Sequence, residues 1–339
     1  MALVNGSRST ILRQATSAWG LLNGVICVYK QPGISVGATH KILKNKICQD
    51  LNSMQRIPRQ EVVQIQRVPK TKPIGEIHSI NTEVDHEVIG EIDDGKGIIR
   101  IVKQKSFADH PLLVGPGYTW QDVKIANANK LGLESSGVMV LGINKGLFQA
   151  QLIDKNRWLK TYVVSGQFGK ATDTFFHSGK VLEKAKFEKI QRFLIDRMLA
   201  RSQASHQKLA FDVAGVRMDT ERAYELASQG VVRAATESSP IIYSVKCIKF
   251  DLPHFDLEIS TINETENYLC RFIHELGLKL HSVAVCTKIR CTKVGPFSSD
   301  LALLQKHWNL EYVLDNISKT SEILKNFNLF EREPMVGKV

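Results

Sequence analysis

Residues 129–142 read NKLGLESSGVMVLG. The stretch starts with polar residues, passes through the turn Ser135-Ser136-Gly137 and enters the uncharged run GVMVLGI at 137–143. A continuous apolar run of this length, bounded by a turn signal, is typical of a strand buried on both faces. We therefore expect a central, buried strand at 137–143.

Strands and helices alternate on both sides of this run. β-branched and apolar stretches predict strands at 21–30, 160–168, 241–250, 255–260 and 283–291. Apolar residues at helical spacing predict helices at 39–51, 186–200 and 261–277, the last with a capping box at Thr261 and Glu264. Mixed elements with hairpin-like neighbours indicate an α+β fold rather than a doubly wound parallel sheet.

The region between 52 and 97 has a different composition from its surroundings. Residues 56–75 are basic and rich in proline, and residues 76–96 are acidic. We interpret 52–97 as an insertion closed by a strand at 98–102, within a main domain at 21–300. A helical tail is expected at 301–339.

The chain is basic, with 45 Lys and Arg against 34 Asp and Glu, a formal net charge of +11. This balance favours a polyanionic partner such as RNA, although a solvated basic surface would also account for it. The six cysteines form no Cys-x-x-Cys pair and the ten histidines form no His-Glu-x-x-His motif. The sequence therefore predicts neither a structural zinc site nor another cofactor.

The first 20 residues resemble a targeting segment. They contain Arg8 and Arg13 among Ser, Thr and small apolar residues, and the first acidic side chain is Asp50. This composition predicts a mitochondrial presequence, with an unstructured tail as the alternative. No segment approaches the ~20 apolar residues that a membrane span needs.

Several separated stretches resemble one family. They are LNGVICVYKQPG, HPLLVGPG, NKLGLESSGVMVLGINKG, KTYVVSGQFGKATD, SHQKLAFDVAG, RAYELASQG, YLCRFIHELGLKL and VCTKIRCTKVGPF, in that order between about 22 and 300. Together they resemble the TruB-type RNA pseudouridine synthases, and are most similar to the animal mitochondrial branch. The resemblance implies one mixed β-sheet flanked by helices. The ~40 residues after Phe297 fall short of the ~50 of the smallest usual domains, so we expect no separate C-terminal RNA-binding domain of the kind that many bacterial relatives carry.

The resemblance also implies a function for the basic charge. In this family RNA lies across a basic cleft and the target uridine is flipped out of its stack, which gives access to its glycosidic bond. A carboxylate attacks the sugar or base, an arginine pairs with the carboxylate, and a tyrosine ring packs on the uracil. Tyr162 matches that tyrosine, although an ordinary strand tyrosine is the alternative. The expected RNA-binding residues are Lys30, Lys160, Lys208, Arg271 and Arg290, among which Lys30 is expected mainly to shape the sheet edge and Lys208 could instead be solvated.

Two departures from the family pattern concern the chemistry. The family run Gly-His-x-Gly-x-Leu-Asp appears here as residues 126–132, ANANKLG, so that Asn127 takes the place of the histidine and Gly132 that of the aspartate. The family run Gly-Thr-Tyr-[Ile/Leu]-Arg appears as residues 266–270, ENYLC, so that Cys270 takes the place of the arginine. Losing one partner of a buried ion pair favours losing the other, because an unpaired buried charge costs several kcal/mol.

The sequence thus predicts an RNA-binding protein of the mitochondrial matrix, a pseudoenzyme in the maturation of mitochondrial mRNA, rRNA or tRNA, with uridine isomerisation weakened or lost. One alternative is an active isomerase that uses Glu134 or Asp122 as a substitute carboxylate. Another is a scaffold in ribosome assembly. RNA-granule or ribosome-assembly proteins are candidate partners.

Overall fold

The computed structural model describes residues 14–54, 62–68, 86–93, 98–104, 117–228 and 239–326. The chain divides into two compact units, Met1–Trp19 with Leu51–Thr119, and Gly20–Asp50 with Trp120–Val339. The second unit contains every site residue predicted above. Within the described ranges, every helix is too short or too polar to span a lipid bilayer.

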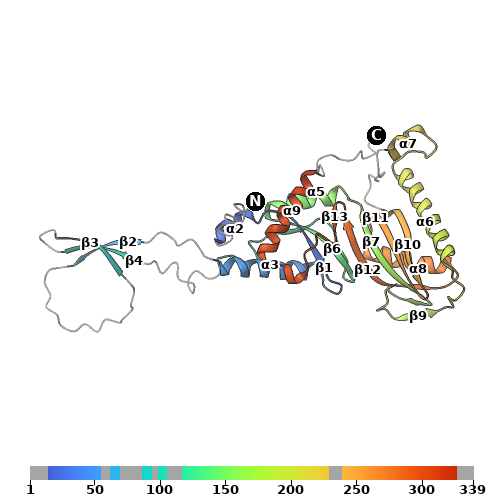
Figure 1. The fold of residues 1–339 in the computed structure, drawn as a ribbon, viewed down its shortest axis with the longest axis horizontal. Helices are drawn as coiled ribbons and strands as arrows, with labels where there is room; N and C mark the ends of the chain where they lie inside the picture. Colours follow the sequence, from blue (N-terminus) through green and yellow to red (C-terminus); the bar gives the residue numbers. More distant parts are fainter. Residues whose placement is uncertain are drawn as a thin grey trace, which may run out of the picture. The chain divides into compact units, whose positions relative to one another are not determined.

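The larger unit is built on one eight-stranded mixed sheet in the order β1-β6-β12-β7-β11-β10, with β5 paired to β6 and β13 to β12 (Figure 1). Its strands are β1 Gly24–Lys30, β5 Ile125–Asn127, β6 Ser135–Ile143, β7 Lys160–Phe168, β10 Ile241–Asp251, β11 His254–Ile262, β12 Ala284–Val294 and β13 Phe297–Ser298. The β6–β12 pair is parallel, and its neighbours β1–β6 and β12–β7 are antiparallel. The predicted α+β class with a single mixed sheet is confirmed.

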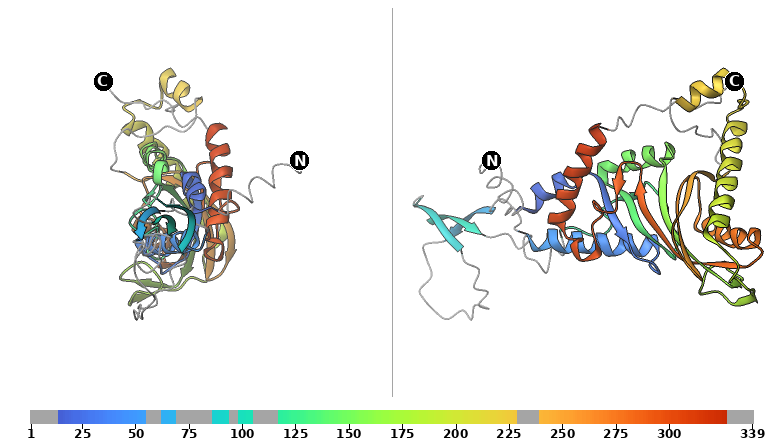
Figure 2. Two further views of the ribbon diagram at one scale, coloured as in Figure 1. Left: turned by 90° about the vertical axis from the view of Figure 1, so that its left-hand side faces the viewer. Right: turned by 45° about the vertical axis from the view of Figure 1, so that its right-hand side comes forward.

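Helices cover this sheet and its ends. They are α3 Val36–Ser53, α5 Leu147–Lys155, α6 Arg192–Val213, α7 Glu221–Ser228, α8 Glu266–Lys279 and α9 Leu310–Asn326, with short 3-10 turns at Asn144–Gly146 and Gln305–His307. Helix α8 packs on the central strand β12, α6 on β10 and α9 on β1. Figure 2 shows α9 and α6 at opposite ends of the sheet. Helix α8 is therefore the helix that meets the middle of the sheet.

The middle of the sheet forms the core. All nine residues of β6 are buried, as the apolar run at 137–143 predicts. Helix α8 buries one face through Leu269, Phe272, Ile273 and Leu276 among others. Each fully buried Leu, Ile or Phe stabilises the fold by ~1.5–3 kcal/mol relative to an exposed one. The ends of β6 and α8 are therefore held in place by the packed core.

Some element boundaries differ from the prediction. The helix predicted at 186–200 begins at Arg192 and continues to Val213. The capping box at Thr261 and Glu264 is not formed, because Thr261 belongs to β11 and the N-cap of α8 is Thr265, whose hydroxyl accepts a hydrogen bond from the Tyr268 amide. The spacings Thr261-x-x-Glu264 and Thr265-x-x-Tyr268 follow one another here, and β11, which runs to Ile262, excludes the first as a helix start.

The smaller unit contains a three-stranded antiparallel sheet in the order β2-β4-β3, made of Val62–Val68, Ile98–Gln104 and His86–Asp93. These strands fall in and just after the insertion predicted at 52–97, and β4 corresponds to its predicted closing strand. Helix α2 covers Ala15–Leu21, and a hairpin of β8 Lys170–Thr172 and β9 Val181–Lys184 completes the elements. The start of the predicted presequence and the stretch HPLLVG lie outside the described residues.

Candidate active site

Gly132 faces the first residue of α8. A Cβ atom placed on Gly132 would lie 2.6 Å from the Cβ of Glu266 and closer still to the Glu266 carboxyl group. Real Cβ contacts are longer, so a side chain at 132 and the present position of Glu266 exclude each other. The space next to residue 132 is therefore filled by a carboxylate that comes from another part of the chain.

Ser135 holds this carboxylate. The Ser135 amide and the Ser135 hydroxyl both donate to Oε2 of Glu266, each at 2.6 Å. Ser135 is buried, whereas Glu266 is partly exposed. Short bonds to an ionised acceptor are stronger than bonds between neutral groups. Glu266 also lies in the first turn of α8, where the helix dipole favours negative charge.

Lys30 supports the same turn from the sheet edge. Its side chain is fully buried, and its ammonium group donates to the backbone carbonyls of Gln31, Leu133 and Ser135. Burial lowers the pKa of Lys30, while the negative charges of Glu266 and Glu134 act to raise it. A fully buried side chain cannot reach RNA directly, so the predicted RNA contact of Lys30 is not available in this conformation. Its contacts are those of a residue that shapes the sheet edge.

Cys270 lies one turn further along α8 and is buried. Its thiol faces Cys286 of β12: the hydrogen bond with Cys270, followed by burial, raises the pKa of Cys286. The side chain at 270 therefore contacts the sheet.

Tyr162 is joined to a second carboxylate. Its ring is buried with 2% exposed, and its hydroxyl donates to Oε1 of Glu264 at 2.6 Å. Burial first, and then the charge of Glu264, raise the pKa of Tyr162 well above its usual value. Lys160 forms an ion pair with the same oxygen at 2.9 Å. Stacking of the Tyr162 ring on a base would require this ring to become uncovered, and that role stays a prediction.

A small opening lies beside this group. It has a volume of about 250 Å³ and is lined by the cations Lys130, Arg157 and Lys160, with Asn263 and Glu264 among its other residues. The carboxylates Asp154 and Glu264 also line it, and Glu264 pairs with Lys160, so three cations against two acids leave a small positive excess that attracts an anion such as a phosphate. Among the described residues, no three His, Cys, Asp or Glu side chains cluster as a metal site would require.

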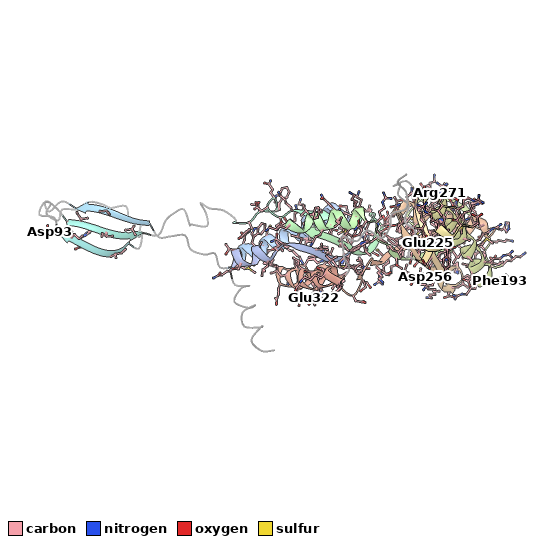
Figure 3. The ribbon with its side chains drawn as sticks, turned by 90° about the horizontal axis from the view of Figure 1, so that it is seen from above. Asp93, Phe193, Glu225, Asp256, Arg271 and Glu322 are labelled. Carbon is pink, nitrogen blue, oxygen red and sulfur yellow. The ribbon has the colours of Figure 1, made fainter. Side chains whose placement is uncertain are left out.

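Other predicted residues lie apart from Gly132. Lys208 on α6 is exposed. Arg271 is exposed on the outer side of α8, where it pairs with Glu275, and Figure 3 shows it at the periphery of the larger unit. The guanidinium of Arg290 lies 5.8 Å from the centre of the Tyr29 ring, and its Nε is buried without a hydrogen-bond partner in the described residues.

The two carboxylates predicted as substitutes are also placed. Glu134 is partly exposed, and its charge acts on Lys30 less than that of Glu266 does. Asp122 lies near Cys48 of α3. The pKa of Cys48 is raised mainly by burial and further by the negative charge of Asp122. The space next to Gly132 itself is filled by Glu266.

Known proteins are similar to this chain in sequence. Residues 119–266 match the family described as TruB family pseudouridylate synthase (N terminal domain). The Xenopus tropicalis protein "Pseudouridylate synthase TRUB2, mitochondrial" is 33% identical over 297 residues, which is 87% of this chain and 85% of that protein. The human protein of the same name is 37% identical over 212 residues, 62% of this chain and 63% of that protein. The chain belongs to the TruB family of pseudouridylate synthases.

A solved structure is also similar. It is the archaeal box H/ACA Nop10–Cbf5 complex, with a TM-score of 0.42 and 12% identity over 88% of this chain and 60% of that chain.

The histidine place of the TruB pattern also contacts a distant residue. Asn127 stands at that place, and its Oδ1 lies 2.7 Å from Nε2 of His40 on α3. Burial lowers the pKa of His40. The neighbouring Asn129, at a family glycine, is fully buried and bonds both the amide of Val140 and the carbonyl of Val138. It fixes the loop before Gly132 to β6.

Sequence reasoning missed Glu266, Glu264 and Ser135 as members of the site. One signal was present for Glu266, because it stands where the TruB pattern has the glycine of Gly-Thr-Tyr-[Ile/Leu]-Arg. A glycine replaced by a large acid, together with an aspartate replaced by glycine, is the pattern that an exchange of volume leaves when two positions are in contact. Nothing in the sequence alone says that these positions touch.

Proposed function

We propose that this protein binds RNA in mitochondria as a member of the TruB family, and that its conversion of uridine to pseudouridine is weakened or lost. Its relatives named as mitochondrial pseudouridylate synthases support the compartment and the RNA class. The acid-free start of the chain supports import into the mitochondrial matrix. Maturation of mitochondrial mRNA, rRNA or tRNA is the role that fits these features.

RNA binding is supported by the net charge of +11 and by the opening lined by Lys130, Arg157 and Lys160. Phosphates that meet Lys and Arg release counterions, and the entropy of that release drives binding. Glu264 lines this opening, and its Oε1 accepts the hydroxyl of Tyr162, the residue that matches the family's tyrosine. Lys208 and Arg271 add exposed positive charge on α6 and α8.

Weakened isomerisation is supported by one observation: position 270, the place of the family's arginine, holds a buried thiol that faces Cys286. A catalytic carboxylate that lacks its partner is less well oriented, and ~1 Å of misplacement can cost about a hundredfold in rate. Restoring the family residues also needs more than Gly132→Asp, because Glu266 fills the space that the new side chain would take.

Two measurements test the proposal. Titration of a mitochondrial RNA stem-loop at two ionic strengths should show an affinity that falls steeply with salt. Tritium release from transcripts labelled at C5 of uridine should be far slower than for a TruB enzyme that has both the aspartate and the arginine. Salt-independent binding would contradict the electrostatic part, and release at the full enzyme rate would contradict weakened catalysis.

Import is tested separately. A fusion that lacks residues 1–20 should no longer enter mitochondria, whereas the full chain should. Entry of the truncated chain at the level of the full chain would contradict the presequence.

A further inference from the structure

Two positions of the family pattern have exchanged a carboxylate for a glycine. The family's aspartate is Gly132 in this chain, and the family's glycine at the start of the helix is Glu266. The two positions are in direct contact. We propose that Glu266 is the carboxylate that acts on the target uridine in this protein, so that isomerisation is weakened but retained. This inference rests on the proposed RNA-binding function.

A side chain at position 132 would overlap Glu266. A Cβ on residue 132 would lie 2.6 Å from the Glu266 Cβ, which is the rigid, backbone-attached end of that side chain. Moving the flexible carboxyl end away would not relieve this overlap. Glycine at 132 is thus a condition for glutamate at 266, and the carboxyl group of Glu266 occupies the room that begins at the missing side chain.

The hydrogen bonds of Glu266 hold one of its two carboxylate oxygens. Both bonds that the described residues give to its carboxylate end on Oε2, from the Ser135 amide and hydroxyl. Oε1 is the oxygen left to act, and the residue is partly exposed. A reacting carboxylate needs this combination, because one oxygen must be held while the other faces the substrate.

The positive charge near Glu266 is the ammonium group of Lys30. Lys30 is fully buried, and the charge of Glu266 acts to raise its pKa more than that of Glu134 does. Its ammonium group uses its three protons on three carbonyl oxygens, so it stabilises the carboxylate by charge and leaves it sterically open. Lys30 therefore takes over part of the role of the family's arginine. It is a positioning residue, since it is itself buried.

The other two candidates are less suitable. The charge of Glu134 affects the pKa of Lys30 less than that of Glu266 does, and the space next to Gly132 is already occupied by Glu266. Asp122 lies near Cys48 on α3. Glu266 is the carboxylate that combines contact with Gly132, two fixed bonds and a free oxygen.

The chemical step balances without a cofactor. Oε1 of Glu266 gives an electron pair to C1′ of the ribose, and the C1′–N1 bond breaks with its electrons going to N1 of the uracil. After the base turns, C5 gives an electron pair to C1′ and the carboxylate leaves with the pair it had donated. The proton on C5 passes to water, and N1 takes a proton from water. The product is an isomer of the substrate, and tritium at C5 would be released.

The experiment is single-turnover tritium release from C5-tritiated mitochondrial transcripts, with the full chain in excess. The native protein should release tritium slowly, and Glu266→Gln should reduce release to background. Glu311→Gln is the matched control, because Glu311 is an exposed glutamate in the first turn of α9 and makes the same change of charge. Glu134→Gln and Asp122→Asn should also keep most of the release.

Folding and RNA affinity are measured for each variant, so that lost release can be assigned to chemistry. Glu266→Gln should keep its thermal midpoint within a few degrees and its RNA affinity within a factor of a few. If Glu266→Gln fails to fold, Glu266→Asp provides the second test: it keeps the carboxylate but withdraws it, and should slow release without abolishing it.

Three results would overturn the inference. They are no release by a native protein that binds RNA, release by Glu266→Gln at the native rate, and release abolished only by Glu134→Gln or Asp122→Asn. The first of these would leave RNA binding with lost isomerisation standing. Failure of the native protein to bind RNA would overturn the proposed function as well.

Discussion

Two carboxylates that stand two residues apart have opposite surroundings. Glu264, just after β11, is buried, with 2% of its side chain exposed, and its Oε1 takes both the Lys160 ammonium and the Tyr162 hydroxyl. Glu266, the first residue of α8, is partly exposed and is held by the amide and hydroxyl of Ser135. Glu264 lies between the end of β11 at Ile262 and the start of α8, whereas Glu266 begins the helix.

The comparison shows how neighbours assign different roles to similar residues. A buried carboxylate paired with a cation is fixed, because removing either partner leaves an unpaired charge. A partly exposed carboxylate held through one oxygen by neutral donors keeps its other oxygen available. We therefore interpret Glu264 as part of the frame and Glu266 as the group that acts.

The largest expected effect is on the frame. Glu264→Gln should lower the free energy of unfolding by about 3–5 kcal/mol, since it leaves the Lys160 ammonium beside a neutral group in a largely buried place. Urea denaturation would measure it. Glu258→Gln is the control, because Glu258 pairs with the exposed Lys246 and its loss should cost under about 1 kcal/mol. Equal costs for the two variants would break the distinction between Glu264 and an ordinary surface ion pair.

The second effect tests the contact between Gly132 and Glu266. Gly132→Ala should destabilise the protein by about 1–3 kcal/mol, because its Cβ overlaps Glu266. The double variant Gly132→Ala with Glu266→Gly should recover part of that loss, and urea denaturation of both single variants and the pair completes the cycle. Additive losses would mean that the two positions do not compete for the same space.

The sheet and α8 could be predicted from the sequence because their signals are local. The uncharged run at 137–143 and the amphipathic pattern ending at Gly277 need no knowledge of distant residues. The α+β class followed in the same way, from helices mixed with strands that are separated by turn signals. Boundaries such as the N-cap of α8 were missed, because Thr261 and Thr265 both satisfy a local capping rule and the tertiary strand pairing of β11 decides between them.

The site could be predicted only in part. Gly132, Cys270 and Tyr162 were predicted as site positions from the family pattern, and their roles stay predictions; that Glu266 fills the space next to Gly132 was not predicted. Ser135 and Glu266 are 131 residues apart in sequence, and their contact depends on where β6 and α8 meet. Lys30 shows the same limit, since only its burial and its three carbonyl partners distinguish a residue that shapes the turn from one that contacts RNA.

A smaller effect separates two adjacent serines. Ser135 and Ser136 are equally buried at 2% exposure, but the Ser135 hydroxyl donates to a carboxylate and the Ser136 hydroxyl to the Ile289 carbonyl. Ser135→Ala should cost about 1.5–2 kcal/mol and Ser136→Ala about 1 kcal/mol, because bonds to charged groups contribute more. Thermal and urea midpoints measure both. In a Glu266→Gln background the difference should vanish, and its persistence would show that Ser135 does not act through Glu266.

The smallest effect is a pH dependence that reports on Lys30. Burial lowers the pKa of Lys30, and Glu266 opposes that shift, so Glu266→Gln should lower the pKa further. A lysine whose folded pKa lies below its unfolded value carries a cost of burial that is fully present below the folded pKa. That cost is lost as pH rises from the folded toward the unfolded value. The destabilisation caused by Glu266→Gln should therefore be greatest near neutral pH and shrink, by a few tenths of a kcal/mol, as pH rises through the folded pKa of Lys30.

Urea denaturation of the native and variant proteins at a series of alkaline pH values measures the difference, in which other titrating groups cancel. Glu134→Gln should show the same sign with a smaller size, because the charge of Glu134 acts on Lys30 less than that of Glu266 does. A penalty for Glu266→Gln that grows with pH would mean that Lys30 does not supply the charge that stabilises this carboxylate.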